Sequence, residues 1–285
     1  MHGRVMVMSM KLTGYLERIG LAGPISADPA GLTLVQAAQR RSIAFENLDV
    51  RLGRGIEIGH EAVFAKLVGE RRGGYCFEHN RLLADMLGEM GLASRPLLAR
   101  PMLGPMLANP AEPMPRTHCL LLLEIGEAPW IADGGFGGAF CPPLPLLEGV
   151  VTTSEDGASH RLRRLGEAGV LPGEWLLERR APGEAEWAAQ FAFDLAEVAP
   201  SDLAMGNHWS CTHPAARFVN EQVVTLCLPD GFASMVDRRF SLHRAGMAAE
   251  RREIGSAAEY GAVLREVFGL ALPEEEVARL PLFTG

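Results

Sequence analysis

A helix is expected to begin inside the run Arg72-Gly73-Gly74-Tyr75-Cys76-Phe77-Glu78-His79-Asn80, with Cys76 at its mouth. Main-chain N–H groups at a helix start have no partner within the helix and carry the positive end of its dipole. A thiolate there is therefore favoured, and the pKa of the thiol falls. The two glycines would let another molecule approach the sulfur closely. The run predicts a nucleophilic cysteine fixed to a buried helix.

Apolar spacing predicts helices first and strands later. After Cys76 a face with a period near 3.6 ends at Gly91, which is well placed as the residue after the helix; its members are Leu82, Leu83, Met86, Leu87 and Met90. From about residue 92 the chain changes to short apolar runs broken by Pro and Gly, which are typical of strands. Helical signals return beyond Ser256. This order predicts an α+β fold rather than a doubly wound sheet.

Two strand-like runs carry further reactive residues. His118 opens the run 117–125, and Asp133 closes the run 129–133. The residues between them read as the turn of a hairpin, so the two strands should be antiparallel neighbours. Alternation places His118 on one face of its strand and Cys119 on the other, so only one of the two should face a shared site.

Composition limits the classes of protein. The chain has 285 residues, 48% of them hydrophobic, which is ample for a buried core. Apolar runs are too short for a membrane span and no signal core is present, so we expect a cytoplasmic protein without membrane contact. A net charge of −8 with only two lysines argues against nucleic-acid binding. Five scattered cysteines predict reduced thiols. The sequence is compatible with a monomer and with a homo-oligomer.

Cys76, His118 and Asp133 have the residue types of a nucleophilic triad. An imidazole can take the thiol proton, and a carboxylate can fix the tautomer and orientation of that imidazole. Each residue also has an ordinary structural interpretation: a packed helix cysteine, a core histidine and a turn-forming aspartate. A metal site built from Cys76, His79, His118 and Cys119 is disfavoured, because Cys76-x-x-His79 has no matching second half. We therefore expect no metal, and His79 should face solvent.

The glycine-rich loop Gly134-Gly135-Phe136-Gly137-Gly138 resembles a phosphate loop only superficially. No Lys-Ser/Thr pair follows it, and it lacks the Gly-x-Gly-x-x-Gly spacing that opens a helix. Glycines beside both Cys76 and Asp133 fit close approach of a ligand. The loop is better suited to admit a thin acyl or pantetheine-like chain beside the cysteine.

Several motifs occur in the order of a known family, and the sequence resembles arylamine N-acetyltransferases of the prokaryotic type. The most specific motif is Arg-Gly-Gly-x-Cys-Phe-Glu-x-Asn at 72–80. The others are Tyr15-Leu16-Glu17-Arg18-Ile19-Gly20, Phe45-Glu46-Asn47-Leu48-Asp49, Arg116-Thr117-His118, Asp133-Gly134-Gly135-Phe136-Gly137 and Asn207-His208-Trp209-Ser210-Cys211-Thr212-His213-Pro214.

The resemblance implies a fold of three parts: a helical bundle over 1–91, a central antiparallel β-barrel-like domain over 92–200 and a C-terminal α/β lid over 201–285. It implies a catalytic core like that of cysteine proteases. It also implies acetyl-CoA as donor substrate, with arylamines, arylhydrazines or arylhydroxylamines as acceptors, and a role in xenobiotic metabolism.

The same resemblance assigns roles to individual residues. Cys76 would be the acetylated nucleophile, His118 the base and Asp133 the acid that orients it. Phe45 would line the acceptor pocket, and Phe136 with Gly137 would flank the acyl site. Arg72 and Glu78 would pin the cysteine loop.

Two departures from the family pattern concern acceptor preference. Ala44 stands where proline usually precedes Phe-Glu-Asn, and Gly134 stands where a small apolar residue usually follows the aspartate. The first would loosen the turn that carries Phe45, and the second would add backbone freedom beside Asp133. Two other functions are compatible with the residues: a hydrolase or transglutaminase-like enzyme with the same triad, and a catalytically silent protein that binds a small aromatic ligand.

Overall fold

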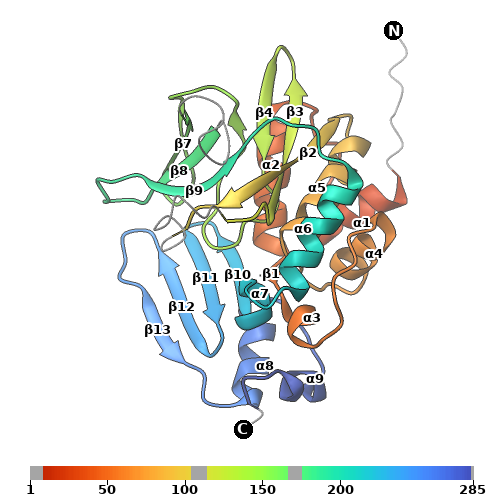
Figure 1. Ribbon diagram of the computed structural model, residues 1–285, viewed down its shortest axis with the longest axis vertical. Helices are drawn as coiled ribbons and strands as arrows, with labels where there is room; N and C mark the ends of the chain where they lie inside the picture. Colours follow the sequence, from red (N-terminus) through yellow and green to blue (C-terminus); the bar gives the residue numbers. More distant parts are fainter. Residues whose placement is uncertain (1–8, 104–113, 166–174, 284–285) are drawn as a thin grey trace.

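Helices form most of the first part of the chain, on the right of Figure 1. The computed structural model describes residues 9–103, 114–165 and 175–283. The helices of this part are α1 (Met10–Arg18), α2 (Pro29–Ser42), α3 (Leu48–Arg51), α4 (His60–Phe64), the π-helical turn η1 (Ala65–Gly69) and α5 (Cys76–Glu89). Apart from α3, whose Leu48 packs with the last part of the chain, their apolar faces share one core that includes Leu16, Leu32, Leu83 and Leu87. Gly91, with φ of +87°, follows the C-cap of α5 as predicted.

A sheet of eight strands follows in the described part of the chain (Figure 1). Its spatial order is β5-β4-β3-β2-β9-β8-β7-β6, and all neighbours are antiparallel. An isolated bridge between Glu148 and Leu162 helps to make the sheet a nearly closed, barrel-like structure. The strands are β2 (Ser94–Pro101), β3 (His118–Ile125), β4 (Ala128–Ala132), β5 (Leu144–Pro145), β6 (Val151–Thr153), β7 (Ser159–Arg164), β8 (Trp175–Arg180) and β9 (Ala188–Phe193).

A second antiparallel sheet lies in the last part of the chain, flanked by helices. It has the order β1-β10-β11-β12-β13, with β1 (Phe45–Glu46), β10 (Val223–Leu228), β11 (Gly231–Val236), β12 (Arg239–Arg244) and β13 (Glu250–Glu253). The helices are α6 (Pro200–Thr212), α7 (Arg217–Asn220), α8 (Ala257–Glu266) and α9 (Glu274–Arg279). Strand β1 comes from the helical part, and Phe45 pairs with Thr225 of β10. The helical part and the last part of the chain are thus joined by strand pairing.

The predicted α+β class is confirmed, with helices, a barrel-like sheet and an α/β part in the expected order. The segment boundaries at residues 91 and 200 stay a prediction. Within the described ranges, no helix combines the length and the apolarity needed to cross a membrane.

Strand β3 separates the helices from the barrel interior and thereby positions the site. Leu120 and Leu122 pack inside the barrel, whereas Leu121 and Leu123 pack against the helical core. This alternation is the one predicted from the sequence. Strands β3 and β4 pair antiparallel, as expected, with Leu121 opposite Ala132. Asp133, one residue beyond β4, therefore lies near the start of β3, where His118 is located.

Candidate active site

Helix α5 begins at Cys76, as predicted, with Tyr75 as its N-cap. The Glu78 carboxylate accepts a hydrogen bond from the Tyr75 main-chain N–H at 2.9 Å, which fixes the first turn. The glycines before the cysteine serve close packing inside the protein rather than access of a ligand. A Cβ on Gly73 would lie 2.3 Å from the Ala44 carbonyl oxygen, and one on Gly74 would lie 2.7 Å from the Glu78 carboxylate.

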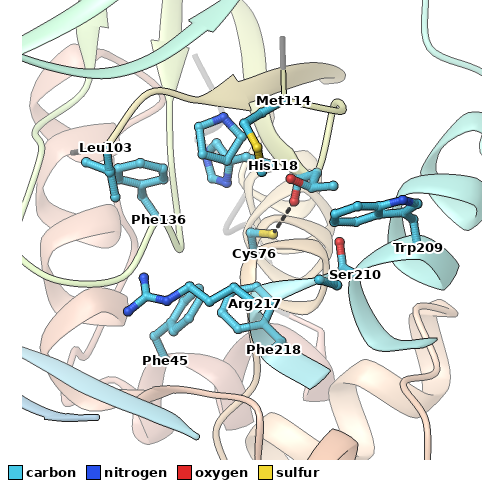
Figure 2. Close-up of a pocket in the computed structure, with 13 residues that line it drawn as sticks. Phe45, Cys76, Leu103, Met114, His118, Phe136, Trp209, Ser210, Arg217 and Phe218 are labelled. Atoms are coloured by element: carbon cyan, nitrogen blue, oxygen red, sulfur yellow. Dashed lines mark hydrogen bonds between the residues drawn. The ribbon is translucent and has the colours of Figure 1, made fainter. Parts of the chain in front are cut away.

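Cys76, His118 and Asp133 converge as the sequence predicted. His118 Nε2 lies 2.8 Å from Asp133 Oδ2, which leaves Nδ1 for the sulfur. The Cys76 thiol lies 3.6 Å from the Thr117 carbonyl oxygen, to which it donates, and Cys76 and His118 are close enough to shift each other's pKa. Figure 2 shows Cys76 and His118 at one pocket. All three side chains are buried.

The charges of these three groups stabilise one another. Burial raises the pKa of the Cys76 thiol, but hydrogen bonds with Cys119 and His118 and the positive charge of His118 lower it more, to about 6. Burial lowers the pKa of His118, but the charge and hydrogen bond of Asp133 raise it to about 9. Burial raises the pKa of Asp133, and the positive His118 brings it below its usual value. At neutral pH the site therefore holds a thiolate and an imidazolium.

We expect iodoacetamide to alkylate Cys76 first, with a rate that is half-maximal near pH 6. Only the thiolate reacts, so the rate should rise as pH passes this value rather than near about 8.5, where a free cysteine titrates. Peptide mass spectrometry at partial modification measures the profile. Burial raises the pKa of Cys141 and Cys227, which serve as internal controls. Earlier labelling of either at neutral pH would contradict the predicted thiolate.

Sequence reasoning missed the residues that hold the loop after Asp133. Gln36 accepts a hydrogen bond from the Asp133 main-chain N–H at 2.9 Å. Asn80 donates to Asp133 Oδ1 at 3.2 Å and accepts from the Gly134 N–H at 2.8 Å. Arg40 donates to the Gly137 and Ala139 carbonyl oxygens. The sequence held a signal for two of these residues. Gln36 and Arg40 are polar and four residues apart, so they share one face of α2, and that face is the buried one.

His79 is buried, so the prediction that it faces solvent was wrong. Its Nε2 lies 3.1 Å from the Ala44 carbonyl oxygen, which ties α5 to the turn before Phe45. Gly134 packs against the same part of α5 and has no space for a side chain. A Cβ there would lie 2.8 Å from Gln39 Nε2 and 3.0 Å from the His79 carbonyl oxygen. Glycine at 134 thus makes room for Gln39 in this protein.

A pocket of about 590 Å³ opens at the sulfur (Figure 2). Phe45 and Phe136 line it, and Phe136 packs edge-on against His118 with ring centroids 4.8 Å apart. Trp209, Ser210, Arg217 and Phe218 also line it, and these come from α6 and α7 of the last part of the chain. Gly137 lines an adjoining cavity of about 770 Å³ that shares Phe45, Leu103, Phe136, Arg217 and Phe218 with the first.

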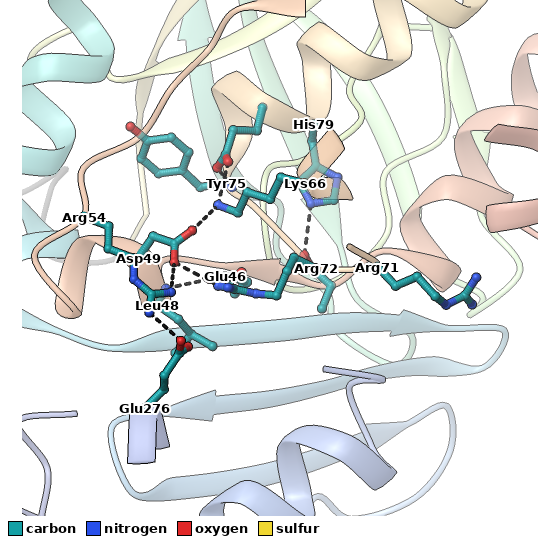
Figure 3. Close-up of polar contacts among 12 residues, drawn as sticks. Glu46, Leu48, Asp49, Arg54, Lys66, Arg71, Arg72, Tyr75, His79 and Glu276 are labelled. Atoms are coloured by element: carbon teal, nitrogen blue, oxygen red, sulfur yellow. Dashed lines mark hydrogen bonds and ion pairs between the residues drawn. The ribbon is translucent and has the colours of Figure 1, made fainter. Parts of the chain in front are cut away.

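Beneath the helix start lies a buried group of charged residues (Figure 3). Lys66 contacts both Asp49 and Glu78 at 2.7 Å. Arg72 contacts Glu46 and Asp49, each at 3.1 Å. Since Glu78 caps α5 and Glu46 lies on β1, these pairs join the cysteine loop to the strand that carries Phe45.

We expect Arg72→Met to lower the free energy of unfolding by about 3 kcal/mol, because Glu46 and Asp49 would stay buried with less compensation. Urea unfolding followed by circular dichroism measures the change. Arg244→Met is the matched control, since its pair with Asp230 is solvent-exposed and should contribute less than about 1 kcal/mol. Equal losses in the two variants would contradict a structural role for Arg72.

The side chains that could bind a metal do not assemble into a site. Among residues 9–103, 114–165 and 175–283, no group of three or more His, Cys, Asp or Glu side chains is placed to hold an ion.

Cys119 and His118 both lie near Cys76. Of these adjacent residues only His118 lines the pocket, as expected from alternation. Cys119 lies on the α5 side of β3, where its Sγ lies 3.3 Å from the Cys76 carbonyl oxygen.

Comparison with known proteins agrees with this fold. A family model described as N-acetyltransferase matches residues 30–277, which places the chain among the acyltransferases. The arylamine N-acetyltransferase of Escherichia coli strain K12 is 36% identical over 269 residues, covering 94% of this chain and 91% of the relative. The chain belongs to the arylamine N-acetyltransferase family.

Solved structures of the family have the same architecture. The arylamine N-acetyltransferase of Salmonella typhimurium superposes with a TM-score of 0.87 at 32% identity, covering 96% of this chain and 98% of that one. The Mycobacterium marinum enzyme, solved in complex with CoA, superposes with a TM-score of 0.82 at 31% identity. The match covers 94% of this chain and 98% of that one. These likenesses disfavour the alternative of a catalytically silent binding protein.

Proposed function

We propose that the protein transfers acetyl groups from acetyl-CoA to arylamines, arylhydrazines and arylhydroxylamines by a ping-pong mechanism through acetyl-Cys76. The observation that carries the proposal is the Cys76 sulfur at the mouth of α5, next to a His118–Asp133 pair with a 2.8 Å contact. The CoA complex of the Mycobacterium marinum relative supports the choice of donor.

In the first half-reaction the Cys76 thiolate attacks the thioester carbonyl carbon. The bond from carbon to the CoA sulfur breaks, and the His118 imidazolium can protonate the departing thiolate. In the second, the acceptor nitrogen attacks acetyl-Cys76, its proton passes to His118, and the Cys76 thiolate is restored. Asp133 raises the pKa of His118, so the imidazole that gave up its proton in the first half-reaction readily takes one up in the second. No metal is needed for either step.

The tetrahedral intermediates carry an oxyanion that needs hydrogen-bond donors. As the first residue of α5, Cys76 has a main-chain N–H that no carbonyl of the helix can accept. We propose this N–H as one donor to the oxyanion. Loss of such a donor typically slows acyl transfer by roughly 10²–10³.

The pocket lining favours an aromatic acceptor over water. Phe45, Phe136 and Phe218 present rings to the space beside the sulfur. Apart from the Cys76–His118 pair, Arg217 is the charged residue in the described lining. Exclusion of water matters because water would hydrolyse acetyl-Cys76.

The chemistry also requires a reduced thiol. All five cysteines are free, which supports the cytoplasmic location expected from the sequence.

We propose that Gly137 shapes the path of the donor, so that Gly137→Val raises the KM for acetyl-CoA about tenfold. Its φ is +85°, where a side chain costs roughly 1–2 kcal/mol, and a Cβ would lie 3.4 Å from the Phe45 ring. Steady-state kinetics of both half-reactions measure the effect. Gly149→Val is the control, because Gly149 has φ of +78° and open space around it. Unchanged kinetics in Gly137→Val would exclude this role.

Intact-mass spectrometry tests the proposed function directly. Brief exposure to acetyl-CoA should add one acetyl group at Cys76, and an arylamine should then remove it with formation of the N-acetylated product. A hydrolase would consume acetyl-CoA at the same rate without an acceptor, and a transglutaminase-like enzyme would require a protein-bound acyl donor. Absence of acetyl-Cys76 under conditions of product formation would rule out the ping-pong route.

A further inference from the structure

A second thiol lies beside the proposed nucleophile. Cys119, the residue after His118 on β3, belongs to the same apolar cluster as Cys76, and both side chains are 3% exposed. Its Sγ lies 3.3 Å from the Cys76 carbonyl oxygen, to which it donates a hydrogen bond. In the proposed acetyl transfer, Cys119 forms no bond to the acetyl group and carries no proton.

The main chains of the two cysteines are held side by side. The Asn80 side-chain amide donates to the Cys76 carbonyl oxygen at 3.1 Å and to the Cys119 carbonyl oxygen at 2.8 Å. One nitrogen thus fixes both residues at adjacent points of α5 and β3. A disulfide needs adjacent main chains of this kind, with Cα atoms about 4.4–6.8 Å apart.

The two thiols differ in reactivity. Cys76 is a thiolate at neutral pH, as argued above, and it lines the open pocket. Burial and the neighbouring Cys76 raise the pKa of Cys119 well above its usual value, so Cys119 stays a neutral thiol. A peroxide that enters the pocket therefore meets one reactive sulfur, and that sulfur has a thiol neighbour.

We propose that Cys119 is a resolving cysteine that captures oxidised Cys76 as a Cys76–Cys119 disulfide. The Cys76 thiolate attacks the O–O bond of a peroxide and becomes a sulfenic acid as hydroxide or alkoxide leaves. The Cys119 sulfur then attacks the Cys76 sulfur, the S–O bond breaks, and the Cys119 proton leaves with the hydroxide as water. Two electrons pass from the two sulfurs to the peroxide.

The disulfide would make inactivation reversible. A sulfenic acid without a nearby thiol proceeds under excess peroxide to sulfinic acid, which thiol reductants do not reverse. A disulfide stops this progression, and a dithiol restores both cysteines by exchange. The loss of activity rests on the proposed function of Cys76, whereas formation of the disulfide does not.

The test treats the reduced full-length protein with hydrogen peroxide and follows intact mass, non-reducing peptide maps and activity before and after dithiothreitol. Wild-type protein should lose two hydrogens, yield a Cys76–Cys119 cross-linked peptide, lose its activity and regain it with the reductant. Cys119→Ala should instead gain oxygen atoms at Cys76 and lose activity permanently. Cys227→Ala, which removes another buried cysteine, should behave like wild type.

If Cys119→Ala does not fold, the same test is made with Cys119→Ser, which keeps the size of the side chain. Oxygen addition at Cys76 in wild-type protein without a cross-link, or a cross-link from Cys76 to Cys141, Cys211 or Cys227, would overturn the proposal. A cross-link in a protein that forms no acetyl-cysteine would leave this proposal standing and refute the proposed function instead.

Discussion

Cys76→Ser is expected to lower kcat/KM for acetyl transfer by at least about 10⁴, as removal of a nucleophile from a triad typically does. The site is built to hold an anion: the pKa of the Cys76 thiol is about 6, and His118 is charged at neutral pH. A serine hydroxyl in the same place stays protonated, so His118 would have to remove its proton during the attack. The charged imidazolium cannot do this.

Two measurements separate loss of chemistry from loss of structure. Release of CoA from acetyl-CoA, with and without an arylamine, reports turnover, and intact mass reports acetylation of the protein. Thermal unfolding should change little, since serine is no larger than cysteine. Cys227→Ser is the matched control, because Cys227 is buried but lies outside the Cys76 cluster. Near-normal turnover in Cys76→Ser would remove Cys76 from the mechanism.

Features with a local cause could be predicted from the sequence. The start of α5 at Cys76 follows from apolar spacing and from Gly91 at its other end, and the β3–β4 hairpin follows from two apolar runs with a short turn. Alternation along β3 follows from the geometry of a strand. The convergence of Cys76, His118 and Asp133 could be inferred only from the family motifs, because residue spacing alone does not show that a helix end and a hairpin meet.

Features that depend on contacts between distant segments could not be predicted. β1 is only two residues long and exists because it pairs with β10 from the last part of the chain. The burial of His79 depends on the Ala44 carbonyl oxygen, which lies in another segment. The glycines before Cys76 were assigned to ligand access, whereas Ala44 and Glu78 occupy the space beside them. Each of these is a tertiary contact without a local signal.

The approach of Cys119 to Cys76 could not be predicted from alternation along β3. Opposite faces of a strand normally lead to separate environments. At the start of β3, however, Cys76 is the first residue of α5. His118 lines the pocket at its sulfur, whereas Cys119 faces the helix and contacts the Cys76 carbonyl oxygen. A helix that begins beside a strand end can therefore meet residues from both faces of that strand.

Asp133→Asn is expected to lower kcat by roughly 10⁴, the loss that the same change causes in a Ser-His-Asp triad. Asp133 Oδ2 accepts from His118 Nε2 at 2.8 Å. An amide nitrogen in that position would donate to Nε2, so the proton of the neutral imidazole would move to Nδ1. That nitrogen could then no longer accept a proton from the sulfur or the acceptor amine.

The pH profile of alkylation distinguishes this mechanism from a general loss of structure. Without Asp133 the pKa of His118 falls, since the carboxylate is the main group that raises it. Cys76 then loses the imidazolium that stabilises its thiolate. Asp133 itself raises the pKa of Cys76 slightly, but this is the smallest of the named effects. The alkylation midpoint should therefore rise from about 6 toward that of a free cysteine.

Asp156→Asn is the matched control, because Asp156 is a buried carboxylate paired with Arg179 in the barrel. It should leave both the turnover rate and the alkylation midpoint unchanged. Asn80 and Gly135, which donate to Oδ1 of Asp133, can still donate to the amide oxygen of asparagine, so the loop should keep its place. A variant at residue 133 with a normal midpoint and normal turnover would reduce Asp133 to a residue that holds the turn after β4.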